Sequence, residues 1–411
     1  MTPSTSRALA ASPIAFLATL TFVNWIGYAG WSALLNNFAK EMAGFTGREI
    51  GLLQTVREIP GFLAVTAVFL FMVMREQTLG YLSLVLLAVG IALTGFHPTL
   101  TGLLLTTFVM SLGFHYFETV NQSLSLQLLP KADAPRLLGR IAGYAAMAQF
   151  AAYGGVALAW WWWKPPYEAL FLAIGAVALA ITVGASLYFG RFQGTVVQRR
   201  GFVLRRRYWL YYALTFMSGA RRQIFMAFAG FLLVERFGYS VADTAKLLLL
   251  TTALNTVAAP RLGAMVGRYG ERATILVENS VLILVFIGYA AASQGLFAPY
   301  DSTLAGAFFV IDGVFFALSI AQRTYIQKIG DPADMAPTAA VAFTINHIAA
   351  VFIPVTFGLI WLANPSIVFL LGAGIATVSL TLALMVPRHP GPGQETTLRS
   401  PAPRGAAVPA E

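Results

Sequence analysis

Residues 166–190 have the sequence PYEALFLAIGAVALAITVGASLYFG, a run of 25 residues with a single charge, Glu168. About 20 predominantly apolar residues are enough for a helix to cross the hydrocarbon core of a membrane. Comparable runs fill the chain, which is 58% hydrophobic and 11% charged, with a mean hydropathy of +0.71. A soluble protein of this composition would expose large apolar patches, and membrane β-barrels alternate apolar with polar residues. The sequence therefore predicts an all-α membrane protein.

Twelve apolar segments of this kind follow one another along the chain. The first is interpreted as an uncleaved helix rather than a secretory signal, because its apolar run is long and no small-residue cleavage site follows it. We expect transmembrane helices near residues 13–36, 49–73, 79–96, 100–128, 138–163, 166–190, 208–234, 241–266, 273–293, 304–328, 337–362 and 365–386.

The basic residues predict the orientation. Lys and Arg number 27 and Asp and Glu 17, a net charge of +10. With a cytoplasmic N-terminus most loop arginines lie inside, and the outer loops hold only Lys40, Arg48, Lys164 and Arg236. Cytoplasmic loops carry this excess, so we expect both termini in the cytoplasm of a bacterial-type inner (plasma) membrane. The charge surplus then indicates contact with membrane lipid and not with nucleic acid.

An internal repeat divides the chain. The triplet Leu20-Thr21-Phe22 recurs as Leu214-Thr215-Phe216, and Gly44-Phe45-Thr46 aligns with Gly238-Tyr239-Ser240 at the same offset. Six helices followed by six in the same order are typical of a duplicated transporter. We expect two six-helix bundles, residues 1–190 and 208–386. Between them lies a basic cytoplasmic linker, 191–207, and after them a disordered tail, 387–411, rich in Pro, Gly and Ala.

One loop carries a family resemblance. Residues 263–272, between the eighth and ninth segments, have the sequence GAMVGRYGER. They resemble the cytoplasmic signature of the major facilitator superfamily, roughly G-x-L-A-D-R-x-G-R-K. Four residues match in frame, and Gly267 replaces the usual Asp. The matching residues, which we assign to a gating motif, are Gly263, Arg268, Gly270 and Arg272.

The chemistry of this motif fits its place at the membrane surface. Glycines allow a tight turn and a close approach of helices, while arginines can cap helix ends or form gating contacts. The corresponding loop of the first half, near residues 74–80, does not match the signature. The resemblance covers about residues 13–386 and implies two bundles that rock around a substrate site at the membrane midplane. It does not identify the substrate.

Ionisable residues inside the spans are costly and mark candidate sites. The seventh span carries Arg221-Arg222, whose side chains diverge by ~100° around the helix. One hypothesis is an anion clamp, because guanidinium groups match carboxylate and phosphate. The alternative is structural ion pairing with Glu118 or Asp312.

Other polar residues of the spans complete the candidate site. His115 and Glu118 share a helix face and predict a proton relay, with a helix–helix hydrogen bond as the alternative. Asp312 and His347 are further candidates for proton coupling, and the repeat places His347 opposite Gln149. Arg57-Glu58 in the second span and Glu278 in the ninth are expected to be structural or near an interface. The remaining predicted substrate ligands are Arg323, Asn121, Gln122, Gln149 and Asn346.

Absent motifs narrow the function. The chain has no cysteine, no G-x-x-x-x-G-K-[ST] phosphate loop, and four histidines in separate segments. We therefore expect no cofactor, no metal site and no nucleotide hydrolysis.

The intramembrane charges favour a proton-coupled secondary active transporter that moves a small organic or phosphorylated anion by alternating access. The alternative is proton-driven efflux of drugs or hydrophobic metabolites, in which Glu118 or Asp312 exchanges a proton for a cation. A third hypothesis, an intramembrane enzyme or a sensor that binds without transport, lacks a nucleophile–base pair in reach. We expect a monomer, not an enzyme, whose ligands are a small molecule and H⁺.

Overall fold

The computed structural model describes residues 12–66, 69–70, 73–129, 134–192, 204–331 and 335–398. All the regular elements of these residues are helical, and nine helices in them are long and apolar enough to cross a membrane. The all-α membrane fold predicted from composition is confirmed. Most of the basic linker, including Arg199 and Arg200, lies outside the described residues.

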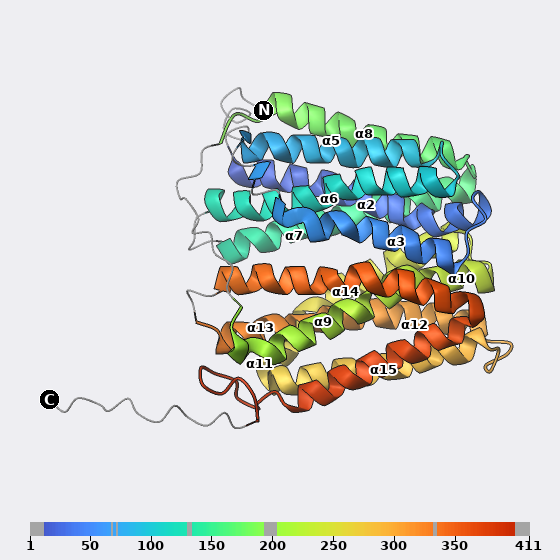
Figure 1. Cartoon of the computed structure of the whole chain (residues 1–411). Helices are drawn as coiled ribbons and strands as arrows, with labels where there is room; N and C mark the ends of the chain where they lie inside the picture. Colours follow the sequence, from blue (N-terminus) through green and yellow to red (C-terminus); the bar gives the residue numbers. More distant parts are fainter. Residues whose placement is uncertain are drawn as a thin grey trace, which may run out of the picture.

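Six rods form the first half of the molecule and lie together in Figure 1. Large apolar side chains with almost no exposure fill their core, among them Phe16, Phe38 and Phe171. Thr46 begins the second rod with a reciprocal cap, in which Glu49 accepts from the Thr46 backbone. The rods are α2 (Pro13–Glu41), α3 (Gly47–Phe62) with η1 (Leu63–Thr66), α5 (Glu76–Thr94), α6 (Leu100–Leu128), α7 (Ala134–Trp162) and α8 (Tyr167–Tyr188).

The second half also consists of six rods, although its helices are divided differently. A π-helical turn, η3, interrupts the seventh predicted span, and a 3₁₀ turn, η4, interrupts the tenth. The elements are η2 (Arg206–Tyr208), α9 (Trp209–Ile224), η3 (Phe225–Ala229), α10 (Gly230–Phe237), α11 (Val241–Ser293), α12 (Asp301–Phe315), η4 (Phe316–Ser319), α13 (Ile320–Ile329), α14 (Met335–Ala363) and α15 (Pro365–Leu384).

The long element α11 is two predicted spans joined at Gly270. This residue has φ 82° and ψ 167°, a conformation that side chains other than glycine rarely adopt. The spans predicted at 241–266 and 273–293 are therefore separate rods, and the twelve predicted segments all have a counterpart among the described helices.

The two halves pack closely at one end of the bundle. Following the orientation predicted from the sequence, we call it the outer end; it carries residues 42–46, and the opposite, inner end carries the connection from α8 to α9 (Figure 1). Here Asn37 donates to the Tyr239 carbonyl at 2.7 Å, and Lys40 pairs with Glu235 at 3.2 Å. These contacts join α2 to the second half, so the structure is closed at its outer end.

Glycines let α3 and α14 approach each other along this interface. A Cβ built on Gly51 would lie 2.2 Å from the Pro354 carbonyl oxygen and 3.0 Å from Gly358 Cα. One turn further along α3, Thr55 donates to the Val351 carbonyl at 2.7 Å. Small residues permit such backbone contact between membrane helices. The close contact of α3 with α14 positions the centre of the molecule, where both helices carry ionisable side chains.

The sequence predicts a disordered tail, but part of this tail is folded. Residues 387–398 form hydrogen bonds with the helices of the second half. The Glu395 carbonyl accepts from the Tyr325 hydroxyl, and the Thr397 amide donates to the Met385 carbonyl at 2.8 Å. These hydrogen bonds hold the segment against the inner end of the second half. Residues 399–411 of the predicted tail lie outside the described residues.

We predict that Gly51→Ala opens the outer end, because its methyl group would overpack the contact with Pro354 by about 1–3 kcal/mol. The chain has no cysteine, so Met42→Cys and Leu296→Cys can carry spin labels at the outer ends of the two halves. The distance between the labels should lengthen in Gly51→Ala. Gly374→Ala, which meets nothing within 4 Å, is the control. Equal label distances in the two variants would contradict the prediction.

Candidate functional site

Glu58 lies in the middle of the molecule and touches both halves. Its carboxylate forms an ion pair with the neighbouring Arg57, and both side chains are almost fully buried. Arg57 is itself held within the first half, because its Nε donates to Gln54 at 2.6 Å and its Nη1 donates to the Tyr28 hydroxyl at 3.0 Å. One carboxylate oxygen of Glu58 is thus fixed by its own helix bundle.

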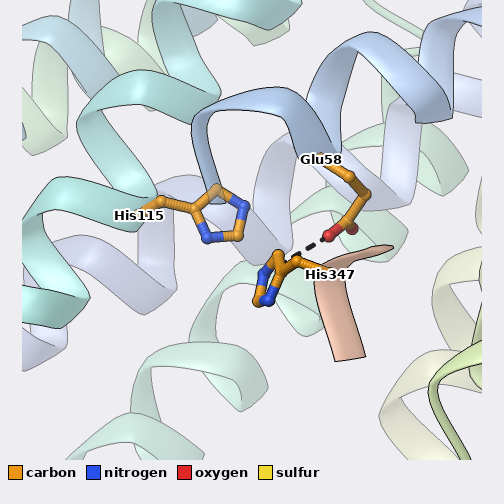
Figure 2. A group of neighbouring side chains, drawn as sticks. All are labelled: Glu58, His115 and His347. Carbon is orange, nitrogen blue, oxygen red and sulfur yellow. Dashed lines mark ion pairs between the residues drawn. The ribbon is translucent and has the colours of Figure 1, made fainter. Parts of the chain in front are cut away.

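The other oxygen of Glu58 faces the second half. Its Oε2 lies 3.6 Å from Nε2 of His347 and 4.0 Å from Nη2 of Arg222, with no hydrogen bond. Figure 2 shows Glu58, His115 and His347 converging from α3, α6 and α14. Residues from both halves therefore meet at one carboxylate.

The tautomer of His347 follows from its other contact. Its Nδ1 lies 2.9 Å from the Phe343 carbonyl, which can only accept, so Nδ1 carries a proton. In a neutral imidazole, Nε2 then presents a lone pair to the carboxylate of Glu58. Two acceptors do not attract, whereas a proton on Nε2 would make a charge-assisted hydrogen bond. A proton on Nε2 would therefore change this contact between the halves from two facing acceptors into a hydrogen bond.

His115 completes this cluster from the first half. Its ring lies 5.4 Å from that of His347, and its buried Nε2 has no hydrogen-bond partner in the part of the chain that the structure describes. The two rings meet over Gly61, where a Cβ would lie 2.3 Å from His347 Cδ2 and 2.9 Å from His115 Cε1. Glycine at this position is what allows the two imidazoles to approach.

The spacing of this cluster would also suit a metal ion. Ligand atoms of Glu58, His115 and His347 lie within 4.8 Å of one another. Two guanidinium groups, however, stand beside the same carboxylate, one paired with it and one 4.0 Å away. With neutral histidines, Arg57, Arg222 and Glu58 sum to +1, which favours an anion and opposes a divalent cation.

The side chains of the two adjacent arginines of α9 lie in different surroundings. This agrees with the predicted divergence of their directions around the helix. Arg222 is 31% exposed and donates to the Asn346 side chain at 3.1 Å. Gly219, one turn earlier, brings the helices together, since a Cβ there would lie 2.9 Å from the Asn346 carbonyl oxygen. Arg222 is therefore an accessible cation at the interface between the halves.

Arg221 is 3% exposed and points into the second half. It pairs with Glu278 at 2.8 Å and lies 3.9 Å from Asp312. The structural alternative, with Asp312 as a partner, thus describes Arg221, and Arg222 alone remains a candidate for binding an anion. Glu278 is also buried rather than interfacial, because its helix restarts at Gly270 and carries it two turns inward.

The Arg221 cluster has an excess of negative charge. One guanidinium faces two carboxylates, so the sum is −1 if both are ionised. Glu278 Oε2 and Asp312 Oδ2 are buried and have no hydrogen-bond partner among the described residues. Uncompensated charge in the protein interior is costly, so one bound proton would stabilise this cluster.

His115 and Glu118, the residues of the predicted proton relay, turn to different neighbours. Glu118 accepts from Asn24 of α2 at 2.9 Å, whereas His115 turns to Glu58 and His347. Asn121, one turn further along α6, donates to Thr21 of α2 at 3.3 Å. The shared face of α6 is divided between two neighbours, so the residues have different partners.

Other predicted ligands lie apart from this centre. Gln149, the counterpart of His347 in the repeat, donates to Ala145 of its own helix at 3.4 Å. Gln122 and Arg323 are exposed. The residues that the sequence prediction undervalued are Arg57 and Glu58, although two opposite charges inside one span were a signal for them.

The predicted gating motif lies at the bend of α11, at the inner end of the molecule. Gly270 forms its bend, and the Arg268 guanidinium lies 5.4 Å from the centre of the Tyr269 ring. Glu271, next to the predicted Arg272, is buried and pairs with Lys328 of α13 at 2.7 Å. Gly263 and Gly267 line a cavity of about 330 Å³ beside this pair.

We predict that Arg221→Ala destabilises the protein much more than Arg222→Ala. Removing Arg221 leaves two buried carboxylates without a cation, and breaking such a pair costs about 3–5 kcal/mol. Arg222 is partly exposed and lies 4.0 Å from Glu58, which is too far for a hydrogen bond. Arg222→Ala should therefore change the free energy of unfolding little. Thermal unfolding of the purified variants measures the difference. An Arg222→Ala protein that melts as low as Arg221→Ala would contradict this assignment.

The comparisons with known proteins agree with this architecture. A sequence model described as Major Facilitator Superfamily matches residues 17–354. No curated protein matches the chain. Among solved structures, a mutant of the nucleoside transporter NupG has a TM-score of 0.74 at 15% identity, covering 90% of this chain and 99% of that one.

Two further solved structures share the fold. A bacterial homologue of the human lysosomal transporter Spinster, inward-facing and occupied, has a TM-score of 0.70 at 14% identity, covering 95% and 98% of the two chains. A POT family transporter in complex with 5-aminolevulinic acid has a TM-score of 0.73 at 11% identity, covering 91% and 95%. The family match spans most of the sequence, and the chain therefore belongs to the Major Facilitator Superfamily and is a multi-pass membrane transporter.

Proposed function

We propose that the protein moves a small organic or phosphorylated anion across a bacterial-type plasma membrane, coupled to protons, by alternating access. The observation that supports this most is the state of Arg222. It is a partly exposed cation at the interface of the halves, and the carboxylate nearest to it already pairs with Arg57. An anion bound beside Arg222 and Asn346 would neutralise the surplus charge.

Proton coupling rests on the contact of His347 with Glu58. The contact joins α14 to α3, so it exists only while these helices are together at the closed outer end. Protonation of His347 strengthens it and therefore favours the closed state. The same proton raises the charge of the cluster from +1 to +2, which favours an anion beside Arg222. Proton and anion thus stabilise the same conformation, as cotransport requires.

The other candidate carriers have supporting roles in this proposal. Asp312 shares Arg221 with Glu278, and this buried pair can hold a proton in the second half. Glu118 is half-buried and tied to Asn24 in the first half. Export of cationic drugs is a weaker candidate, because Arg221 already lies 3.9 Å from Asp312, one of the two carboxylates at which the cation would bind.

We predict that Arg222→Ala lowers anion uptake into proteoliposomes by about 10- to 100-fold, because a charge-assisted hydrogen bond contributes about 1.5–3 kcal/mol. A panel of labelled organic acids and sugar phosphates should be tested at fixed pH. Arg236→Ala, an exposed arginine of α10, is the matched control. If no acid of the panel is transported by the wild-type protein, the proposed substrate class is wrong.

We also predict that uptake rises as the external pH falls, and that His347→Gln removes this dependence. Protonation of His347 promotes closure and anion binding, so activity is gained on the acidic side of its titration and lost as the pH rises. Gln can donate to Glu58 without titrating. His97→Gln, an exposed histidine between α5 and α6, is the control. A pH profile that is the same in His347→Gln and His97→Gln would assign the proton to another residue.

A further inference from the structure

Six rings form a continuous row across the centre of the molecule. Trp25 and Tyr28 of α2 both contact Phe114 of α6, with ring centres 5.9 and 4.6 Å apart. Phe114 contacts His115 at 5.2 Å, and His115 contacts His347 of the second half at 5.4 Å. The row therefore crosses between the halves at the cluster described above.

The row ends on an exposed aromatic ring, Phe343, in the same stretch of α14 as the partner of Arg222. Phe343 of α14 stacks on His347 with ring centres 4.1 Å apart, yet its side chain is 44% exposed. Phe343 lies one turn before His347 and three residues before Asn346, the partner of Arg222. At the other end of the row, Trp25 and Phe114 are also only half-buried.

The exposure of Phe343 does not come from the lipid-facing side of α14. Phe343 shares its face with His347, which is buried against Glu58 of α3. Phe352, which is 65% exposed, lies nine residues later, or ~900° around the helix, on the opposite side. Phe343 is thus an apolar ring exposed on the face that meets the other half, and Asn346 on the same helix binds the accessible guanidinium of Arg222. A flat apolar ligand that packs on this ring would be covered by protein.

These observations specify the substrate class further. A ligand with a carboxylate at Arg222 and Asn346 would bring its remaining atoms against Phe343. Aromatic rings prefer offset or edge-to-face contact with another ring, an attraction that a saturated ring of the same size lacks. We propose, as an extension of the proposed anion transport, that the substrate is an aromatic acid whose ring stacks on Phe343 while its carboxylate binds Arg222.

The test compares two acids of similar size and charge, phenylacetate and cyclohexylacetate. Calorimetric titration of the purified full-length protein should give about 3- to 10-fold tighter binding of phenylacetate, the usual size of a ring–ring preference. Phe343→Leu should abolish the difference without losing either acid. Phe352→Leu, on the opposite side of the same helix, should keep it. Phe114→Leu is a second variant from the first half of the molecule and should reduce the difference.

The outcomes separate this inference from the proposed function. If both acids bind the wild-type protein with equal affinity, or if Phe343→Leu keeps the preference, the aromatic class is wrong and anion binding stands. If neither acid binds, the aromatic inference is overturned. If, in addition, the wider acid panel is not transported, the proposed function fails as well.

Discussion

The carboxylate of Glu58 is shared between the two halves of the protein, and the rest of the site depends on how its charge is compensated. A buried charge is tolerated only when it is paired. Arg57 pairs with one oxygen from within the same helix, and Gln54 and Tyr28 hold that guanidinium in place. The second oxygen has its neighbours, His347 and Arg222, in the other half. The contact of α3 with α14 therefore places this second oxygen beside a histidine and an arginine of the other half.

Two neighbouring residues of α9, Arg221 and Arg222, lie in clusters of opposite net charge. Arg221 lies in a cluster with one more carboxylate than cations, and Arg222 lies in a cluster with one more cation than carboxylates. Under the proposed function, a bound proton would neutralise the first cluster and a bound anion would neutralise the second. Because the two side chains leave the same turn of helix, a movement of α9 affects both clusters together. This arrangement supplies a physical route for coupling a proton to an anion.

The sequence was sufficient for the fold because its signals act within a single helix. Apolar runs of sufficient length predict spans, and a glycine between two such runs marks the break at Gly270. The divergence of Arg221 and Arg222 follows from helix geometry alone. Partner choice is different, because it depends on how each helix is rotated against its neighbours. The repeat placed Gln149 opposite His347, but it fixes only the order of helices and not the direction of a side chain.

The same limit explains why Glu58 was undervalued. Its partners His347 and Arg222 come from α14 and α9, far away in sequence, and only the close contact permitted by Gly51 and Gly61 brings them together. His115 and Glu118 share a helix face, yet that face meets α2 at one residue and α14 at the other. Which neighbour each residue of a helix face contacts depends on how the helices pack. The sequence of a single segment does not contain this information.

The central claim is that proton and anion bind cooperatively at one cluster. The most direct measurement is the number of protons taken up when the purified protein binds an acid, from calorimetric titrations in two buffers of different ionisation enthalpy. This account predicts net uptake of about one proton per anion near neutral pH, because the bound anion stabilises protonated His347 beside Arg222. Binding without any change in protonation, or with proton release, would contradict it.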